Sequence, residues 1–143
     1  IGFSELHAQR IIDKIPRLLG VQSAACCPIY KAYAENRGQI ERSTPTYETL
    51  AEGIAAEFPI RGQMIMDALR ETDGAFTIID EEEIKLGIKI VASKGIYIEP
   101  TSAVVVKAFE KFVQSEIISK GDRVVSILTG SGLKATDKLM KML

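Results

Sequence analysis

The sequence predicts an α/β fold: three α/β/α layers around a mainly parallel sheet, built as a single unit over residues 1–143. Short apolar runs typical of buried strands alternate along the chain with longer stretches that have the composition of helices. Strands separated by helices favour parallel pairing through right-handed crossovers. The 143 residues are 46% hydrophobic, enough for one buried core, and no repeat or linker divides them.

The chain begins with a helix, a strand and a second helix. The stretch Ser4–Lys14 has helical composition but only a partial apolar stripe. Leu18–Ser23 is a short β run and predicts a sheet strand. Cys27–Asn36 predicts a helix, because Pro28 suits a first turn and Gly38 lies beyond the expected end.

A polar segment separates this part from the next helix. Gln39–Tyr47 predicts an exposed loop, while Leu50–Ala56 is short, apolar and ambiguous. Gln63–Thr72 predicts a helix that ends at Asp73 and Gly74, a pair typical of a helix carboxyl terminus.

The second half has clearer boundaries. Ala75–Ile79 predicts a buried strand, and Asp80 with Glu83 three residues later predicts a capping box at the start of the next helix. The three glutamates at 81–83 also suit the positive end of the helix dipole, which explains them better than a metal site does. This helix is expected to end near 93–95.

Three more elements follow. Ile96–Ile98 is a brief extended piece, and the helix from Thr101 or Ser102 to Phe112 is apolar nearly all round, which predicts burial. Val124–Leu128 predicts the final strand, and Lys134–Leu143 predicts a terminal helix.

Composition excludes several classes of function. The net charge is −1, which gives no basic footprint for nucleic acid, and no apolar run reaches the roughly 20 residues of a membrane span. Cys26 and Cys27 are adjacent and poorly placed to pair, so they predict small buried side chains in a reducing cytoplasm. With His7 alone they do not make a metal site.

The most informative stretch is Gly121–Lys134, where the predicted strand ends in Thr129, Gly130, Ser131 and Gly132. In α/β proteins a ligand sits just past the carboxyl ends of parallel strands, where glycine lets the backbone approach closely. We therefore expect the Thr129 hydroxyl to face such a crevice without a structural partner. A strand followed by a loose glycine turn is the alternative.

Blocks of sequence over nearly the whole chain resemble threonine synthase, a pyridoxal-phosphate enzyme of the tryptophan-synthase-β-like fold type (fold type II). They occur in the family's order and spacing. The blocks are Gly2–Leu6, Ile15–Gln22, Cys27–Ile29, Thr49–Ala55 with Pro59, Ala68–Gly74, Asp80–Ile84, Glu99–Ala103 and Thr129–Lys134.

The resemblance implies pyridoxal phosphate as cofactor and assigns roles to residues of this chain. It places the Thr129 hydroxyl against the pyridine nitrogen, where a hydroxyl can donate to an unprotonated nitrogen. Gly130 would let the backbone pass close to the ring. Glu99 would lie near the ring, although its place before a helix is equally consistent with a capping carboxylate.

The resemblance also implies that parts are missing. The family's Schiff-base lysine and the glycine-rich phosphate loop lie upstream of the first block, so the chain resembles a carboxyl-terminal segment, a partial copy of the large domain. We expect it to be catalytically inactive alone, to contain no catalytic residue and to bind the cofactor weakly.

Three functions are therefore open. The first is a segment of threonine synthase, a cytoplasmic lyase of threonine biosynthesis that converts O-phosphohomoserine and water to threonine and phosphate. The second is a segment of a related enzyme, such as threonine dehydratase or cysteate synthase. The third is a non-catalytic α/β binding module. We also expect a homo-oligomer, because an incomplete sheet exposes apolar surface.

Overall fold

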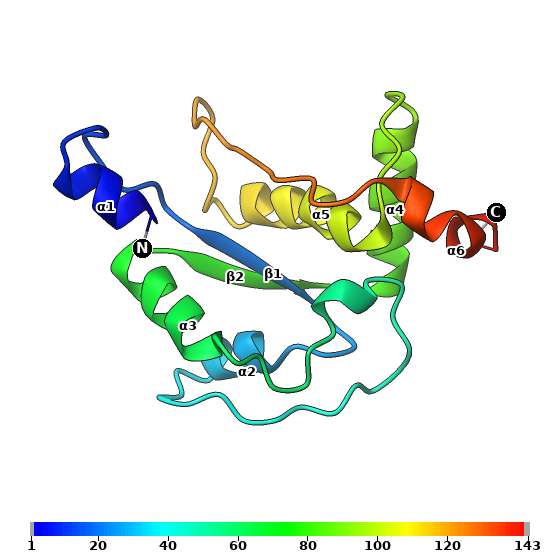
Figure 1. The fold of residues 1–143 in the computed structure, drawn as a ribbon, viewed down its shortest axis with the longest axis horizontal. Coiled ribbons are helices and arrows are strands. Elements are labelled where there is room, and N and C mark those ends of the chain that lie inside the picture. The colour runs from blue at the N-terminus through cyan, green and yellow to red at the C-terminus, as the bar shows by residue number, and fades with distance from the viewer. Residues whose placement is uncertain (1, 142–143) are drawn as a thin grey trace.

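Two parallel strands form the centre of the molecule, and helices cover both faces of the sheet (Figure 1). The computed structural model describes residues 2–141. Strand β1 (Leu19–Ser23) pairs with β2 (Ala75–Ile79) in register, from Leu19 opposite Ala75 to Ser23 opposite Ile79. The predicted three-layer α/β/α arrangement and parallel sheet are confirmed.

The helices occupy the two outer layers. Helices α2 and α3 lie on one face of the sheet, and α5 lies across the other face with α4 packed against it (Figure 1). In chain order the helical elements are α1 (Gly2–Ala8), α2 (Pro28–Ala34), the 3₁₀ turn η1 (Glu52–Ile54), α3 (Gly62–Glu71), α4 (Glu81–Ala92), α5 (Pro100–Gln114), the 3₁₀ turn η2 (Gly132–Ala135) and α6 (Thr136–Met140).

The sheet separates two apolar clusters. Alternate residues of β2 point to opposite faces, so Phe76 joins the cluster under α2 and α3 while Ile79 joins the cluster under α5. Each fully buried large side chain contributes roughly 1.5–3 kcal/mol. The buried members on the α5 side include Ile84, Val104, Ala108 and Phe112, and those on the other side include Ile29, Met66 and Leu69.

Most element boundaries agree with the sequence analysis. The capping box of α4 is present: the Glu83 amide donates to Asp80 Oδ1 at 2.9 Å, and the Asp80 amide donates to Glu83 Oε2 at 3.0 Å. The first helix is shorter than predicted, since α1 ends at Ala8 and Arg10 has a positive φ of 59°. Its partial apolar stripe buries no residue, which leaves little to extend the helix.

The predicted final strand at Val124–Leu128 is wrong. This segment is extended, but it pairs with neither β1 nor β2, and among residues 2–141 no main-chain hydrogen bond joins it to another segment. Val125 is 82% exposed and Ile127 is 72% exposed. An apolar β run becomes a strand only when a neighbouring strand satisfies its backbone hydrogen-bonding groups. This segment has no such neighbour, because the chain returns along α5 rather than along an edge of the sheet (Figure 1).

Two glycines allow close packing. At the end of α3 the left-handed residue is Asp73, with φ 49°, rather than Gly74. Gly74 is required for another reason: a Cβ there would meet the Leu18 carbonyl oxygen closer than 3.0 Å. In α4, a Cβ on Gly87 would lie 2.7 Å from the Ala103 carbonyl oxygen, so the absence of a side chain lets α4 and α5 approach closely at this point.

We predict that Gly74→Ala destabilises the chain by about 1–3 kcal/mol, because the new methyl group meets backbone that cannot move cheaply. The control is Gly38→Ala, where a Cβ would meet nothing within 4 Å. That change should alter stability by less than about 1 kcal/mol. Urea unfolding checks both variants through the midpoint at constant slope. Equal midpoints for the two variants would contradict the packing argument.

Candidate functional site

The candidate site forms where the chain entering α5 meets the segment before η2. The Glu99 amide donates to the Gly130 carbonyl at 3.1 Å, and the Gly132 amide donates to the Tyr97 carbonyl at 3.1 Å. Between them Ile98 pairs with Ser131 as an isolated antiparallel bridge. Two segments far apart in the sequence thus lie side by side, and they carry all three predicted site residues.

Glu99 is placed by its proline neighbour. Pro100 begins α5, and Glu99 before it is extended, with φ −71° and ψ 156°. Glu99 occupies the N-cap position, but its side chain accepts no capping hydrogen bond. The carboxylate lies instead against Gly130, so close that a Cβ on Gly130 would clash with it. Glycine is therefore required at position 130 because the Glu99 carboxylate lies so close to it. The sequence alone could not indicate this contact.

Thr129 differs from its prediction in two respects. It does not end a strand, and its hydroxyl has a partner: Thr129 Oγ1 lies 3.0 Å from Ser102 Oγ. Its side chain is nevertheless exposed. The hydroxyl is therefore held by Ser102 within an exposed residue, and its one proton and two lone pairs leave it capacity for a second hydrogen bond.

Ser102 is the residue of this site to which sequence reasoning gave no role. It lies in the first turn of α5 and is 1% exposed. Ser102 contacts Gly130 as well as Thr129, because the Gly130 amide donates to Ser102 Oγ at 2.9 Å. One indication of this role was present in the sequence: Ser102 lies three residues after the N-cap Glu99, within the same family block.

A second polar network lies at the carboxyl edge of the sheet. Ser23, the last residue of β1, donates from its hydroxyl to Thr49 Oγ1 at 3.0 Å. Thr49 in turn hydrogen-bonds to the Glu81 carboxylate, which also accepts from the Leu50 amide at 2.9 Å. This network holds the loop between α2 and η1 onto the ends of both strands, so Glu81 anchors a loop as well as starting α4.

The same loop reaches the candidate site. The Gly53 amide in η1 donates to Thr101 Oγ1 at 3.3 Å, one residue before Ser102. Lys138 in α6 forms an ion pair with Glu52 in η1. Turn η1 therefore contacts both the first turn of α5 and helix α6, next to the candidate site.

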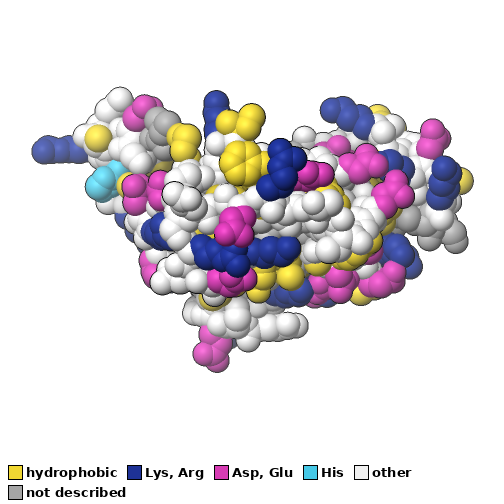
Figure 2. Space-filling model, turned by 90° about the horizontal axis from the view of Figure 1, so that it is seen from below, with side chains coloured by type: hydrophobic (Ala, Val, Ile, Leu, Met, Phe, Trp, Pro, Cys, Tyr) yellow, Lys and Arg dark blue, Asp and Glu magenta, His cyan; other side chains and the backbone are white. Residues whose placement is uncertain are grey.

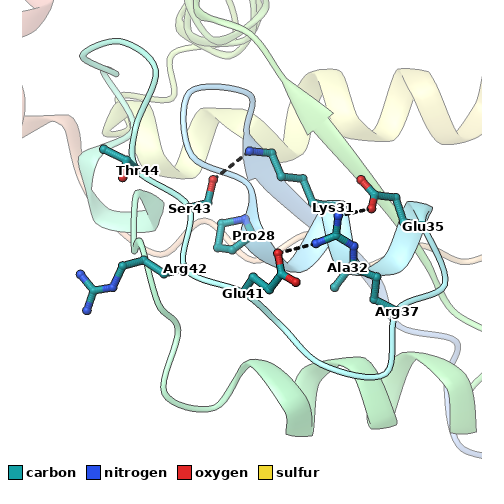
Figure 3. Close-up of a pocket in the computed structure, with 9 residues that line it drawn as sticks. All are labelled: Pro28, Lys31, Ala32, Glu35, Arg37, Glu41, Arg42, Ser43 and Thr44. Atoms are coloured by element: carbon teal, nitrogen blue, oxygen red, sulfur yellow. Dashed lines mark hydrogen bonds and ion pairs between the residues drawn. The ribbon is translucent and has the colours of Figure 1, made fainter.

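A separate hollow lies elsewhere on the molecule. It has a volume of about 440 Å³ and is bounded by α2 and the following loop, with no residue in common with the Thr129 and Glu99 site (Figure 3). Its charges are of both signs: Arg37 pairs with both Glu35 and Glu41, and the Lys31 ammonium donates to the neutral Ser43 hydroxyl at 2.9 Å (Figure 3). The hollow therefore offers no concentrated charge to a ligand.

Charges of both signs are mixed across the surface. Figure 2 shows acidic and basic side chains next to one another on the face seen from below. Ion pairs among the described residues include Arg42 with Glu57 at 3.0 Å and Arg70 with Asp67 at 3.8 Å. On the face drawn in Figure 2, the described residues form no extended basic stripe of the kind that binds nucleic acid.

The two cysteines lie in the core. Cys26 is 1% exposed and Cys27 is 5% exposed, and both are free thiols. Burial raises the pKa of each thiol, and at Cys27 the nearby Lys31 ammonium opposes that rise. A raised pKa keeps the thiol protonated, so neither side chain is activated as a nucleophile.

Between residues 2 and 141, no helix has both the length and the apolar character needed to cross a membrane.

Comparison with known proteins gives a family and a set of relatives. A family model described as "Pyridoxal-phosphate dependent enzyme" matches residues 1–130. Threonine synthase of Methanocaldococcus jannaschii is 32% identical over 142 residues, covering 98% of this chain and 35% of that protein. Threonine synthase of Methanosarcina acetivorans is 35% identical over 136 residues, covering 93% of this chain and 33% of that protein. The chain thus spans about a third of the curated relatives it matches.

Solved structures agree in fold. Maize serine racemase superposes with a TM-score of 0.67 at 18% identity, covering 96% of this chain and 42% of that one. A threonine deaminase of T.th. superposes with a TM-score of 0.57 at 20% identity, covering 90% of this chain and 43% of that one. At these identities the likeness concerns the fold alone, and it identifies the fold as that of a fold-type-II enzyme.

We predict that Gly130→Ala displaces the Glu99 carboxylate, because the added methyl group takes its place. The cost in unfolding free energy should be about 1 kcal/mol, since the clashing atoms belong to a flexible side chain. In the E99A background the same substitution should cost less than about 0.5 kcal/mol. A four-variant cycle of urea unfolding measures this coupling, and an equal cost in both backgrounds would disprove the contact.

Proposed function

The chain belongs to the family of pyridoxal-phosphate-dependent enzymes, and from this we propose that it is the carboxyl-terminal part of a threonine synthase. Such an enzyme is a lyase that converts O-phosphohomoserine and water to L-threonine and phosphate. The identities of 30–35% to proteins named threonine synthase, extending over nearly all of this chain, support the assignment. The structural neighbours named threonine deaminase and serine racemase, at 18–22% identity, favour no other reaction.

The residues of the candidate site fit the family's cofactor. Pyridoxal phosphate, when bound, accepts electron density from the substrate's α-carbon into its pyridine ring. An exposed hydroxyl that is fixed on one side matches what a ring nitrogen needs, and Thr129 is such a hydroxyl. This is the observation that carries the proposal. A hydroxyl leaves the ring a milder acceptor than a carboxylate would, because it cannot hold the nitrogen protonated.

The other two predicted residues take supporting roles in this proposal. Gly130 follows Thr129 and lets the main chain run close to neighbouring groups, as its approach to Glu99 illustrates. Glu99 holds a carboxylate beside Gly130, just before α5, and would lie near the cofactor ring. Neither residue would exchange a proton with the substrate.

The resemblance to threonine synthase supplies the group that moves protons. It places the Schiff-base lysine upstream of the first matched block, so we assign proton transfer at the substrate to that lysine and not to Thr129, Gly130 or Glu99. We also infer a cytoplasmic homo-oligomer, and the exposed apolar side chains of Val125, Ile127 and Leu133 support its assembly.

We predict that Thr129→Val in the complete enzyme lowers kcat/KM or cofactor affinity roughly tenfold, because the ring nitrogen loses its hydrogen-bond partner. Valine keeps the shape of the side chain but removes the 3.0 Å partner of the buried Ser102 hydroxyl, so the unfolding free energy should fall by about 1–3 kcal/mol. Thr129→Ser, which keeps the hydroxyl, is the control and should retain activity within about threefold. Threonine formation and cofactor titration are measured. Full activity in the valine variant would show that Thr129 is not part of the cofactor site.

We predict that the 143-residue chain alone forms no threonine from O-phosphohomoserine with added pyridoxal phosphate. Without the lysine and the phosphate-binding loop that the family resemblance places elsewhere, the cofactor is neither attached nor oriented. Phosphate release and threonine are measured against a buffer control and against the complete enzyme. Turnover of the chain above the buffer control would contradict this division of roles.

A further inference from the structure

Ser102 is the buried residue that the proposed roles leave unexplained. Its hydroxyl is enclosed at the start of α5 and hydrogen-bonds to the segment that carries Thr129. Ser102 Oγ accepts from the Gly130 amide at 2.9 Å, lies 3.0 Å from Thr129 Oγ1, and lies 3.5 Å from the Gly130 carbonyl oxygen. A serine hydroxyl has one proton to donate, so Ser102 can donate to Thr129 Oγ1 or to the Gly130 carbonyl oxygen, but not to both at once.

The proton of Ser102 has two possible acceptors. Donation to Thr129 Oγ1 gives a hydrogen bond of ordinary length, whereas donation to the Gly130 carbonyl spans 3.5 Å, the limit of a hydrogen bond. The first arrangement forms a chain of donors from the Gly130 amide through Ser102 to Thr129. Thr129 then accepts on its inner side, and its own proton points outward on the exposed side.

We propose that Ser102 is a positioning residue that holds the Thr129 hydroxyl as an outward donor. This inference rests on the proposed function, in which that hydroxyl faces the pyridine nitrogen of the cofactor. An outward donor matches an unprotonated nitrogen, while an outward lone pair would match a protonated one. Ser102 would thus set the protonation state of the ring without touching it, and Thr129 alone would leave that choice open.

The experiment measures the ring nitrogen directly. The complete enzyme is loaded with pyridoxal phosphate that carries the heavy nitrogen isotope in its ring, and the nitrogen chemical shift is recorded by NMR. In the unsubstituted enzyme we expect an unprotonated, hydrogen-bonded nitrogen. In Ser102→Ala the shift should move in the same direction as in Thr129→Val, by a smaller amount, because the threonine hydroxyl becomes free to rotate.

Kinetics separate positioning from simple anchoring. Ser102→Ala should lower kcat/KM roughly three- to tenfold, the effect of one hydrogen bond. In the T129V background the same substitution should lower it by less than about twofold, since no hydroxyl remains to orient. If Ser102 serves only to anchor Gly130, its effect will be equally large in both backgrounds, and the proposal is overturned.

Two further variants keep the test decisive. Thr101→Val removes the neighbouring hydroxyl, which binds the Gly53 amide rather than Thr129, and should leave the nitrogen shift unchanged. If Ser102→Ala does not fold, Ser102→Cys offers a weaker donor of similar size and should give an intermediate shift. A shift in Ser102→Cys equal to that of the unsubstituted enzyme overturns the proposal.

The outcomes also separate this inference from the proposed function. If Thr129→Val leaves both the nitrogen shift and turnover unchanged, the proposed site is wrong, and the role of Ser102 falls with it. If Thr129→Val changes both quantities while Ser102→Ala changes neither, the proposed function stands and only the role of Ser102 is overturned.

Discussion

A short antiparallel crossing of two segments determines the site. Two main-chain hydrogen bonds, at the Tyr97 carbonyl and the Glu99 amide, join the entry to α5 to Gly132, the first residue of η2, and to Gly130. These bonds fix the path of a segment that has no other backbone partner among the described residues. Gly130 and Gly132 permit the crossing, because a side chain at either position would collide with Glu99 or with the Tyr97 ring. The hydroxyl of Thr129 is placed by this crossing rather than by a strand.

The parts of the fold that were predictable are those set by local chemistry. Strand β2 is a short run that is apolar apart from Thr77 and lies between a helix end and a helix cap, so its bounds at Ala75–Ile79 follow from neighbouring residues alone. The same holds for α4, whose first turn contains both halves of the Asp80 and Glu83 capping box. The start of α5 was predicted at Thr101 or Ser102, one or two residues late, because Pro100 itself occupies the first helical position and keeps Glu99 before it extended.

The parts that were not predictable depend on contacts between distant residues. The apolar run Val124–Leu128 has the composition of a strand, but composition does not say whether a neighbouring strand is within reach. The sequence showed Ser102 as a hydroxyl near the start of a helix. Its role in the site depends on hydrogen bonds with Thr129 and Gly130, which lie beyond the end of α5 in the sequence. The three predicted site residues do come together, and the family resemblance, not their spacing, suggested the grouping.

The close approach of α4 and α5 at Gly87 has a consequence for how this sequence can vary. Gly87 faces the carbonyl of Ala103, the residue that follows Ser102, so the depth of the first turn of α5 is set by the absence of a side chain in α4. A larger residue at position 87 would lift that turn and carry Ser102 away from Thr129. Substitutions at 87 should therefore be accepted only together with compensating changes near the start of α5, so position 87 would evolve in step with the site.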